Sequence, residues 1–330
     1  MPEGLQGPSG IRLFDIIGGR KDTARDIVLS LLQNVLEEGF IYGIVAMGVY
    51  ITYKILDFPD LSVDGTFPLG CAVTAALIVG GVNPWLACIA SFGAGVLAGC
   101  VTGLLHVKLR VTDLLSGIIV MTACWSVNLV ILGAHMPNPL AGNSLLQFYN
   151  MPTIFTSLPM SLLPAGLYRY RVLILTAVLA IVVKLLMDWF LRTKSGMLLR
   201  AAGDNAQFVT SLAKDQGSIK VLGLAIGNGC TALAGSILAQ QAESATVSIG
   251  TGMVVQALAA VIIGSSVFGR IRRLKPTSAV LLGTMLYKLV LLVAMLWLPA
   301  TFLKLTMAVL FVAALLTDRV GRKKGSVIHG

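Results

Sequence analysis

The sequence predicts an all-α fold, a polytopic membrane helix bundle, and three observations lead to this prediction. Hydrophobic residues make up 56% of the 330 residues, and charged residues make up only 12%, about half the share of a soluble domain. The mean hydropathy is +0.86. The apolar residues also form long runs separated by short charged blocks. At about 20 residues per crossing, the chain has room for about 8–10 transmembrane or re-entrant helices and for no sizeable soluble domain.

Each expected helix corresponds to one apolar run. The runs are Leu32–Tyr53, Gly65–Val82, Pro84–Val107, Leu114–Ala134, Arg171–Leu191, Ile219–Gln240, Met253–Gly269, Ser278–Leu298 and Thr301–Thr317. They define a transmembrane domain over residues 32–324, preceded by an N-terminal tail or surface helix (1–31) and followed by a C-terminal tail (325–330). The first 27 residues lack a continuous apolar core, so we expect the first membrane helix to act as the insertion signal.

The net charge of +10 indicates membrane orientation rather than binding to nucleic acid. The Lys and Arg residues concentrate in four short stretches, which we place on the cytoplasmic side: His106–Arg110, Arg192–Lys214, Arg270–Lys275 and Arg319–Lys324. With the C terminus inside, nine crossings put the N terminus outside. Either the N-terminal tail lies outside, or one early segment is re-entrant, or Ile11–Ser30 forms a surface helix.

Two of the apolar runs are short and follow a break in the pattern. Gly65–Val82 comes after the acidic stretch Asp57–Asp64, and Met253–Gly269 comes after the Gly-rich stretch Ser248–Gly252. Interrupted segments at corresponding places in two halves predict a binding site or pathway near mid-membrane. The candidate pathway residues are Asp60, Ser62, Asp64, Thr66, Asn128, Asn228 and Gln256.

These candidates suit an amino-acid-like solute. A helix that restarts near Asp64 offers free N–H groups to a carboxylate, and the acidic side chains offer partners to an ammonium group. The alternative for Asp64 is that it only caps its helix. The alternative for Asn128, Asn228 and Gln256 is that they hydrogen-bond between helices.

Other ionisable residues within the runs have simpler interpretations. Lys184 and Asp188 are four residues apart and are expected to form an ion pair on one helix face. Lys288 is a lone deep cation that either reaches an interface or contacts the pathway. Glu37 and Glu38 are expected at the rim of the first helix.

The cytoplasmic stretch 192–217 is too long for a turn. Met197–Ala202 is expected to form a short helix that Gly203 ends, with Asp204 or Asn205 capping a second helix up to Lys214. Its basic and apolar side chains suit either docking of a cytosolic protein or packing on the chain's own bundle. The candidate docking residues are Arg192, Lys194, Gly196, Arg200, Gly203, Asp204 and Asn205.

The same stretch carries a resemblance to a known family. The pattern Gly196-x-x-x-Arg200-Ala-x-Gly203-Asp204-Asn205 resembles the ATPase-coupling loop of permeases from bacterial ABC importers of the branched-chain amino acid and ribose type. Asp60-Leu-Ser-Val63 is similar to a turn of the sugar permeases, although Asp64 precedes the family's Gly. The similarity runs from Leu32 to Lys324 and is greatest to a branch assigned to amino acids. The additional acidic residue and the absence of an extra first helix argue against a sugar.

The resemblance implies a permease subunit of an ATP-driven importer, multi-pass in the bacterial cytoplasmic (inner) membrane. The implied partners are ABC ATPase subunits, an extracytoplasmic substrate-binding protein, a second permease copy in a homodimer, and the lipid bilayer. No phosphate-binding Gly-x-x-x-x-Gly-Lys-Ser/Thr motif occurs, so we expect no cofactor on this chain, with ATP and Mg on the partner ATPase. The glycines on one run suit close approach of a second copy or packing within the chain: Gly93, Gly95, Gly99 and Gly103.

Two other functional classes were considered. An ion-coupled secondary transporter or channel would also contain broken helices, but it would not need a long helical docking segment in the cytoplasm. A membrane-embedded enzyme is not supported, because the three histidines and five cysteines show no catalytic-triad or metal-ligand spacing. We therefore expect no catalytic residues and no metal site, and we interpret the cysteines as packing residues.

Overall fold

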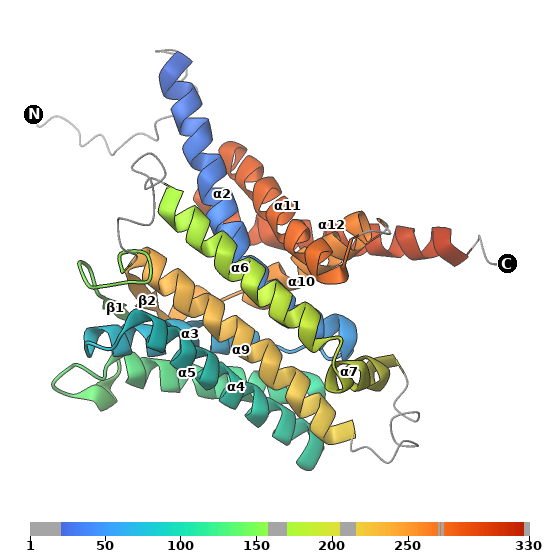
Figure 1. The fold of residues 1–330 in the computed structure, drawn as a ribbon, viewed down its shortest axis with the longest axis horizontal. Coiled ribbons are helices and arrows are strands. Elements are labelled where there is room, and N and C mark those ends of the chain that lie inside the picture. The colour runs from blue at the N-terminus through green and yellow to red at the C-terminus, as the bar shows by residue number, and fades with distance from the viewer. Residues whose placement is uncertain (1–20, 158–169, 205–215, 270, 272–273, 327–330) are drawn as a thin grey trace, which may run out of the picture.

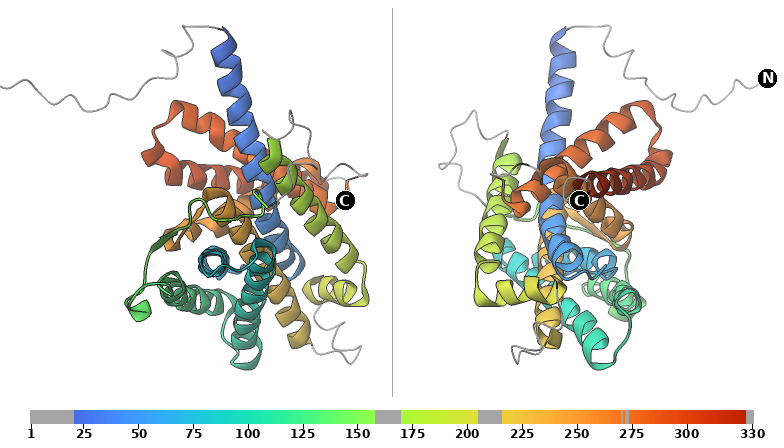
Figure 2. Two further views of the ribbon diagram at one scale, coloured as in Figure 1. Left: turned by 60° about the vertical axis from the view of Figure 1, so that its left-hand side comes forward. Right: turned by 90° about the vertical axis from the view of Figure 1, so that its right-hand side faces the viewer.

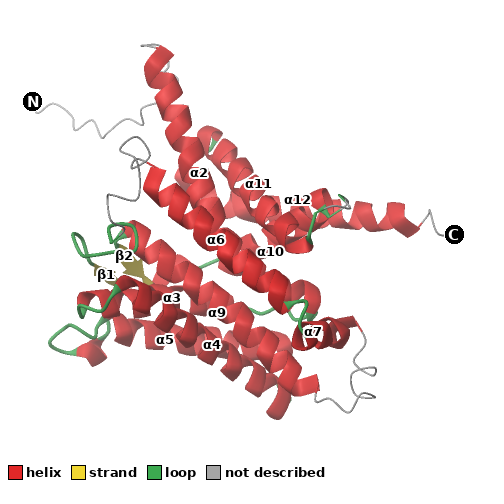
Figure 3. Cartoon of the chain, viewed as in Figure 1, coloured by secondary structure: helices red, strands yellow, loops and turns green. Residues whose placement is uncertain are grey.

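The computed structural model describes residues 21–157, 170–204, 216–269, 271 and 274–326. The described chain is a bundle of helices with two very short strands (Figures 1 and 3). The principal elements are α2 (Lys21–Val49), α3 (Val63–Val79), α4 (Pro84–Lys108), α5 (Asp113–Leu132), β1 (Leu145–Gln147), α6 (Arg171–Phe190), α7 (Lys194–Asp204), α9 (Gln216–Ala242), β2 (Ser244–Thr246), α10 (Met253–Ile263), α11 (Pro276–Trp297) and α12 (Leu303–Ser326).

Each of the nine predicted apolar runs forms a helix. Seven helices among the described residues are long and apolar enough to cross a membrane, and two shorter apolar helices correspond to α3 and to the first part of α12. α2 begins at Lys21, within the segment that the sequence suggested as a tail or surface helix. Two helices continue into π-helical turns, α2 through Tyr50–Ile55 and α10 through Gly264–Phe268.

Glycines on α4 bring that helix close to α9. A Cβ added at Gly99 would lie 2.8 Å from the Leu224 carbonyl carbon, and one at Gly103 would lie 2.8 Å from the Val221 Cα. Gly95 faces α9 in the same way, whereas Gly93 has no heavy atom within 4 Å of its added Cβ. Three of these glycines therefore serve packing within the chain, the second of the two interpretations given above.

Helix α3 lies inside the bundle and contacts α4, α5 and α9. Figure 2 (left) shows it nearly along its axis, with other helices around it. Small residues again permit the close approach to α9, because a Cβ at Gly70 would lie 2.6 Å from the Ala232 carbonyl carbon. A side chain at such a glycine would force the backbones of α3 and α9 apart, so the position of α3 depends on these small residues.

Three of the predicted cytoplasmic stretches meet on one face of the molecule. His106 Nε2 lies 3.3 Å from Lys220 Nζ, which joins the end of α4 to the start of α9. Lys275 Nζ lies 3.0 Å from Asp188, which joins the start of α11 to the end of α6. The end of α2 reaches the same face at Ile55, beside α7. The end of α2 therefore lies on the face that carries these predicted cytoplasmic stretches.

On the opposite face, two loops pair through a short antiparallel ladder. Leu145 of β1 is opposite Thr246 of β2, and Gln147 is opposite Ser244 (Figure 3). β2 follows α9 directly and leads into the segment before α10. The outer loop after α5 is thereby joined to the chain that enters α10.

Candidate functional site

A buried polar network holds the break between α2 and α3. Asn228 of α9 donates from Nδ2 to Asp60 Oδ2 at 2.7 Å. Its Oδ1 accepts from Ser62 Oγ at 3.1 Å and from Thr66 Oγ1 at 2.8 Å. All four side chains are buried. The structure thus brings four of the seven pathway candidates together, and one side-chain amide joins them.

Asp64 caps a different helix from the one in which it lies. Its Oδ2 accepts from the Gly252 N–H at 3.0 Å, and its Oδ1 accepts from the Val254 N–H at 2.8 Å. Gly252 has φ +85°, a left-handed conformation that a side chain would strain. The carboxylate satisfies N–H groups at the start of α10. The two broken segments, 188 residues apart in sequence, therefore meet at Asp64.

The two remaining candidates make interhelical contacts and leave one atom unpaired. Asn128 of α5 donates to the Gly65 carbonyl at 3.2 Å, next to the Asp60 network. Gln256 of α10 donates to the Met307 sulfur of α12 at 3.4 Å. Within the described part of the chain, the Oδ1 of Asn128 and the Oε1 of Gln256 have no hydrogen-bond partner. Gln256 does not join the Asp60 network.

A second polar cluster joins α2 to α11. Lys288 Nζ lies 2.9 Å from Glu38 Oε2 and 3.4 Å from the centre of the Tyr42 ring. Lys288 is therefore buried against α2 and does not reach an interface. Glu37 is also buried, and Gln33 and Gln241 donate to its carboxylate. The expectation that Glu37 lies at a rim was therefore wrong, whereas Glu38 is exposed.

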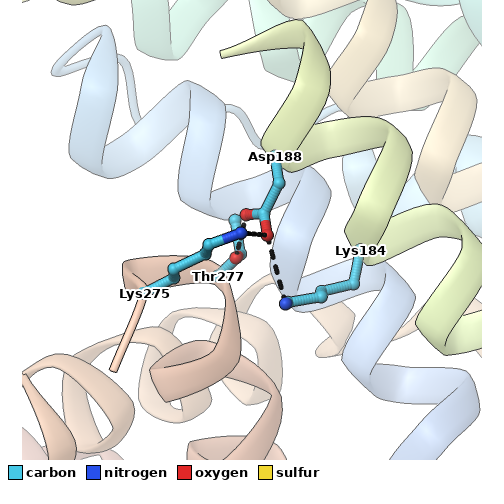
Figure 4. Close-up of polar contacts among 4 residues, drawn as sticks. All are labelled: Lys184, Asp188, Lys275 and Thr277. Carbon is cyan, nitrogen blue, oxygen red and sulfur yellow. Dashed lines mark hydrogen bonds and ion pairs between the residues drawn. The ribbon is translucent and has the colours of Figure 1, made fainter. Parts of the chain in front are cut away.

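A third cluster ties α6 to α11 at the cytoplasmic face (Figure 4). Asp188 lies 3.1 Å from Lys184, as the spacing of the two residues predicted, and 3.0 Å from Lys275. The Thr277 hydroxyl also donates to the Asp188 carboxylate. Asp188 thus connects the helix that precedes α7 with the first turn of α11.

Helix α7 forms the described part of the predicted docking segment. One face is buried against the bundle through Gly196, Leu199 and Ala202, while Arg192 and Arg200 are exposed. Lys194 is exposed as well. The basic side chains are therefore available to a cytosolic partner, whereas Leu199 is used in packing on the chain's own helices.

Gly203 does not end this helix, because α7 continues to Asp204. Its role is close contact: a Cβ at Gly203 would lie 2.8 Å from the Ile55 carbonyl carbon. The prediction of a left-handed stop was wrong, because Gly203 lies within the helix. The absence of a side chain is needed there for close contact with Ile55. The Asp204 side chain, Asn205 and the predicted second helix lie outside the described residues.

Comparison with known proteins identifies the family. The family model described as "Branched-chain amino acid transport system / permease component" matches residues 31–317. The chain belongs to this family. It is therefore a permease component of a transport system and a multi-pass protein of the bacterial inner membrane, as the resemblance predicted.

Individual relatives come from amino-acid and sugar systems. The chain is 37% identical over 293 residues, 88% of this chain and 92% of the relative, to the tyrosine transport system permease protein of Clostridioides difficile (strain R20291). It is 29% identical over 238 residues, 71% of this chain and 68% of the relative, to the ribose import permease protein of Bacillus subtilis (strain 168). No solved structure matches the chain significantly.

Proposed function

We propose that this permease imports an amino acid and obtains its energy from a separate ABC ATPase. In this proposal, two copies of the chain form a homodimer, two ATPase subunits bind the cytoplasmic face, and an extracytoplasmic binding protein delivers the solute. ATP and Mg bind to the ATPase, and this chain binds no cofactor. The family supports a multicomponent system rather than a self-sufficient carrier.

The geometry of α7 is the observation that carries the ATPase assignment. α7 presents basic residues to the cytosol on one side and contacts Ile55, at the end of α2, on the other. Its first turns pack equally closely on the preceding helix, since a Cβ at Gly196 would lie 2.6 Å from the Leu191 Cα. An ATPase that displaces α7 would therefore displace the cytoplasmic ends of α2 and α6 directly.

The pathway is proposed to pass the junction of the two broken segments. Asp60, Ser62, Thr66 and Asn228 satisfy one another's hydrogen bonds, so we assign them to a fixed wall of the pathway. Asp64 is proposed to connect α3 with the mobile start of α10. Asn128 and Gln256, each with one oxygen that has no partner among the described residues, are proposed to face solute or water during transport.

An amino acid is the substrate class that the sequence and the relatives support together. The relative with 37% identity is named for tyrosine transport, and ionisable groups within membrane spans mark solute pathways. A neutral sugar would leave those charges without a counterpart in the solute.

Reconstitution tests the proposal. The purified chain, its ATPase and its binding protein are placed in vesicles, and uptake of labelled L-tyrosine and other L-amino acids is measured with and without ATP. We expect uptake that requires ATP, the ATPase and the binding protein. Concentration of solute by the chain alone on an ion gradient would contradict the proposal.

A further inference from the structure

A small cavity lies inside the bundle between α2, α10 and α11. Its polar lining consists of Tyr42, Gln256, Thr284, Tyr287 and Lys288. Its volume is about 10 Å³, room for about one water molecule. The structure therefore shows this site in a closed form, with its polar groups gathered around very little space.

Two of the lining groups have unused hydrogen-bonding capacity. The Gln256 Oε1 is an acceptor and the Tyr287 hydroxyl is a donor, and within the described residues neither atom has a partner. Both side chains are at least nine-tenths buried. Buried polar atoms are rarely left unpaired without a reason, so the cavity offers one free donor and one free acceptor.

The two charged residues beside the cavity differ in their exposure. The Lys288 side chain is 7% exposed, whereas the Glu38 side chain that pairs with it is 48% exposed. Glu38 lies in the apolar span Leu29–Ile55, about 14 Å along the helix from Leu29. A charged side chain that contacts the hydrocarbon of a bilayer is costly. The exposed part of Glu38 must therefore face a second protein surface or a water-filled path.

We propose that this cluster is the zwitterion-binding site of the pathway and that it recognises the backbone of an α-amino acid. The solute carboxylate binds Lys288 and the Tyr287 hydroxyl, and the solute ammonium group binds Glu38 and the Gln256 Oε1. The zwitterion replaces the internal ion pair one charge for one charge, so no buried charge is left unpaired. This inference rests on the proposed function, because it names the recognition site for the same solute.

Binding to the purified full-length chain tests the inference without the partner proteins. Each labelled L-amino acid is tested in turn, L-tyrosine first, and the amino acid that binds is competed with two of its analogues. The decarboxylated amine (tyramine for tyrosine) lacks the carboxylate, and the deaminated acid, 3-(4-hydroxyphenyl)propionate for tyrosine, lacks the ammonium group. We expect saturable binding of the zwitterion and at least tenfold weaker binding of either analogue.

Two variants separate recognition from packing. Lys288→Gln is expected to weaken zwitterion binding about 10- to 100-fold, the loss of one charge-assisted hydrogen bond, and to leave amine binding unchanged. Glu38→Gln is expected to weaken zwitterion binding similarly and to leave binding of the deaminated acid unchanged. Lys304→Gln removes an exposed cation of α12 and is expected to change nothing.

Three outcomes would overturn the inference: no saturable binding of any amino acid, equal losses for all three ligands in both variants, or full affinity in the charge-exchanged pair Glu38→Lys with Lys288→Glu. The last two would mean that the pair only holds α2 to α11. ATP-dependent uptake by the assembled importer is measured separately. If that uptake occurs while one of these outcomes is found, this inference fails and the proposed function stands.

Discussion

Substitution of Gly203 by valine should uncouple the permease from its ATPase. The added Cβ would lie 2.8 Å from the Ile55 carbonyl carbon, whereas carbon atoms in contact are about 3.5–4.0 Å apart. The end of α7 must therefore move by at least about 0.7–1.2 Å, because the Ile55 carbonyl oxygen lies closer still to the added Cβ. Overpacking of this kind costs about 1–3 kcal/mol, and valine recovers only a few tenths of a kcal/mol in helix propensity. The net cost of about 0.7–2.7 kcal/mol corresponds to a roughly 3- to 100-fold smaller population with α7 in its present position.

The assay is ATP hydrolysis and solute uptake by the reconstituted importer. We expect Gly203→Val to insert normally and to lose at least about two thirds of substrate-stimulated hydrolysis, the threefold lower limit of that range. Gly93→Val is the matched control, since an added Cβ at Gly93 has no heavy atom within 4 Å. Unchanged coupling in Gly203→Val, with the control also unchanged, would refute the reasoning that α7 transmits force through Ile55.

Three further substitutions address the other contacts. Asp64→Asn removes the charge of the carboxylate that accepts two N–H groups at the start of α10. The loss of about 1.5–3 kcal/mol in hydrogen bonding should slow uptake while the ATPase still co-purifies. Unchanged uptake kinetics would leave Asp64 as a cap only. Asn228→Leu leaves the buried Asp60 carboxylate without its 2.7 Å donor, although the Ser62 N–H still donates to it. Loss of a hydrogen bond to a charged group costs about 1.5–3 kcal/mol, so the thermal midpoint in detergent should fall by several degrees, and an unchanged midpoint would contradict the network. Asp188→Asn removes the charge from contacts with Lys184 and Lys275, whose side chains are 18% and 46% exposed. Both cations can turn to solvent, so the loss is about 0–1 kcal/mol. The midpoint should barely change, and a large drop would show that this contact contributes far more to folding.

The sequence was sufficient to predict the helices because lipid imposes a length and a composition on each crossing. All nine runs form helices, and the two interrupted segments do meet, through Asp64. The partner of Asp64 could not be predicted, because the sequence pattern of an acidic residue beside a helix start is the same whether the residue caps its own helix or another one.

The hydropathy pattern did not indicate which side chains far apart in the sequence would contact each other. Glu38 and Lys288 are 250 residues apart, and their contact depends on α2 lying next to α11, which hydropathy does not specify. The glycines of α4 show the same limit, since small residues favour close approach to any helix. Gly203 is informative in another way: glycine serves both left-handed turns and close contacts, and only the position of Ile55 distinguishes them.

The strand pair β1–β2 connects the loop after α5 to the chain segment that enters the bundle at α10. β2 ends at Thr246, and the start of α10 is held by Asp64 only a few residues later. A receptor that presses on the loop bearing β1 would therefore pull on the same chain segment that Asp64 anchors. In the proposed importer, docking of a loaded binding protein on this loop would therefore act on the helix break.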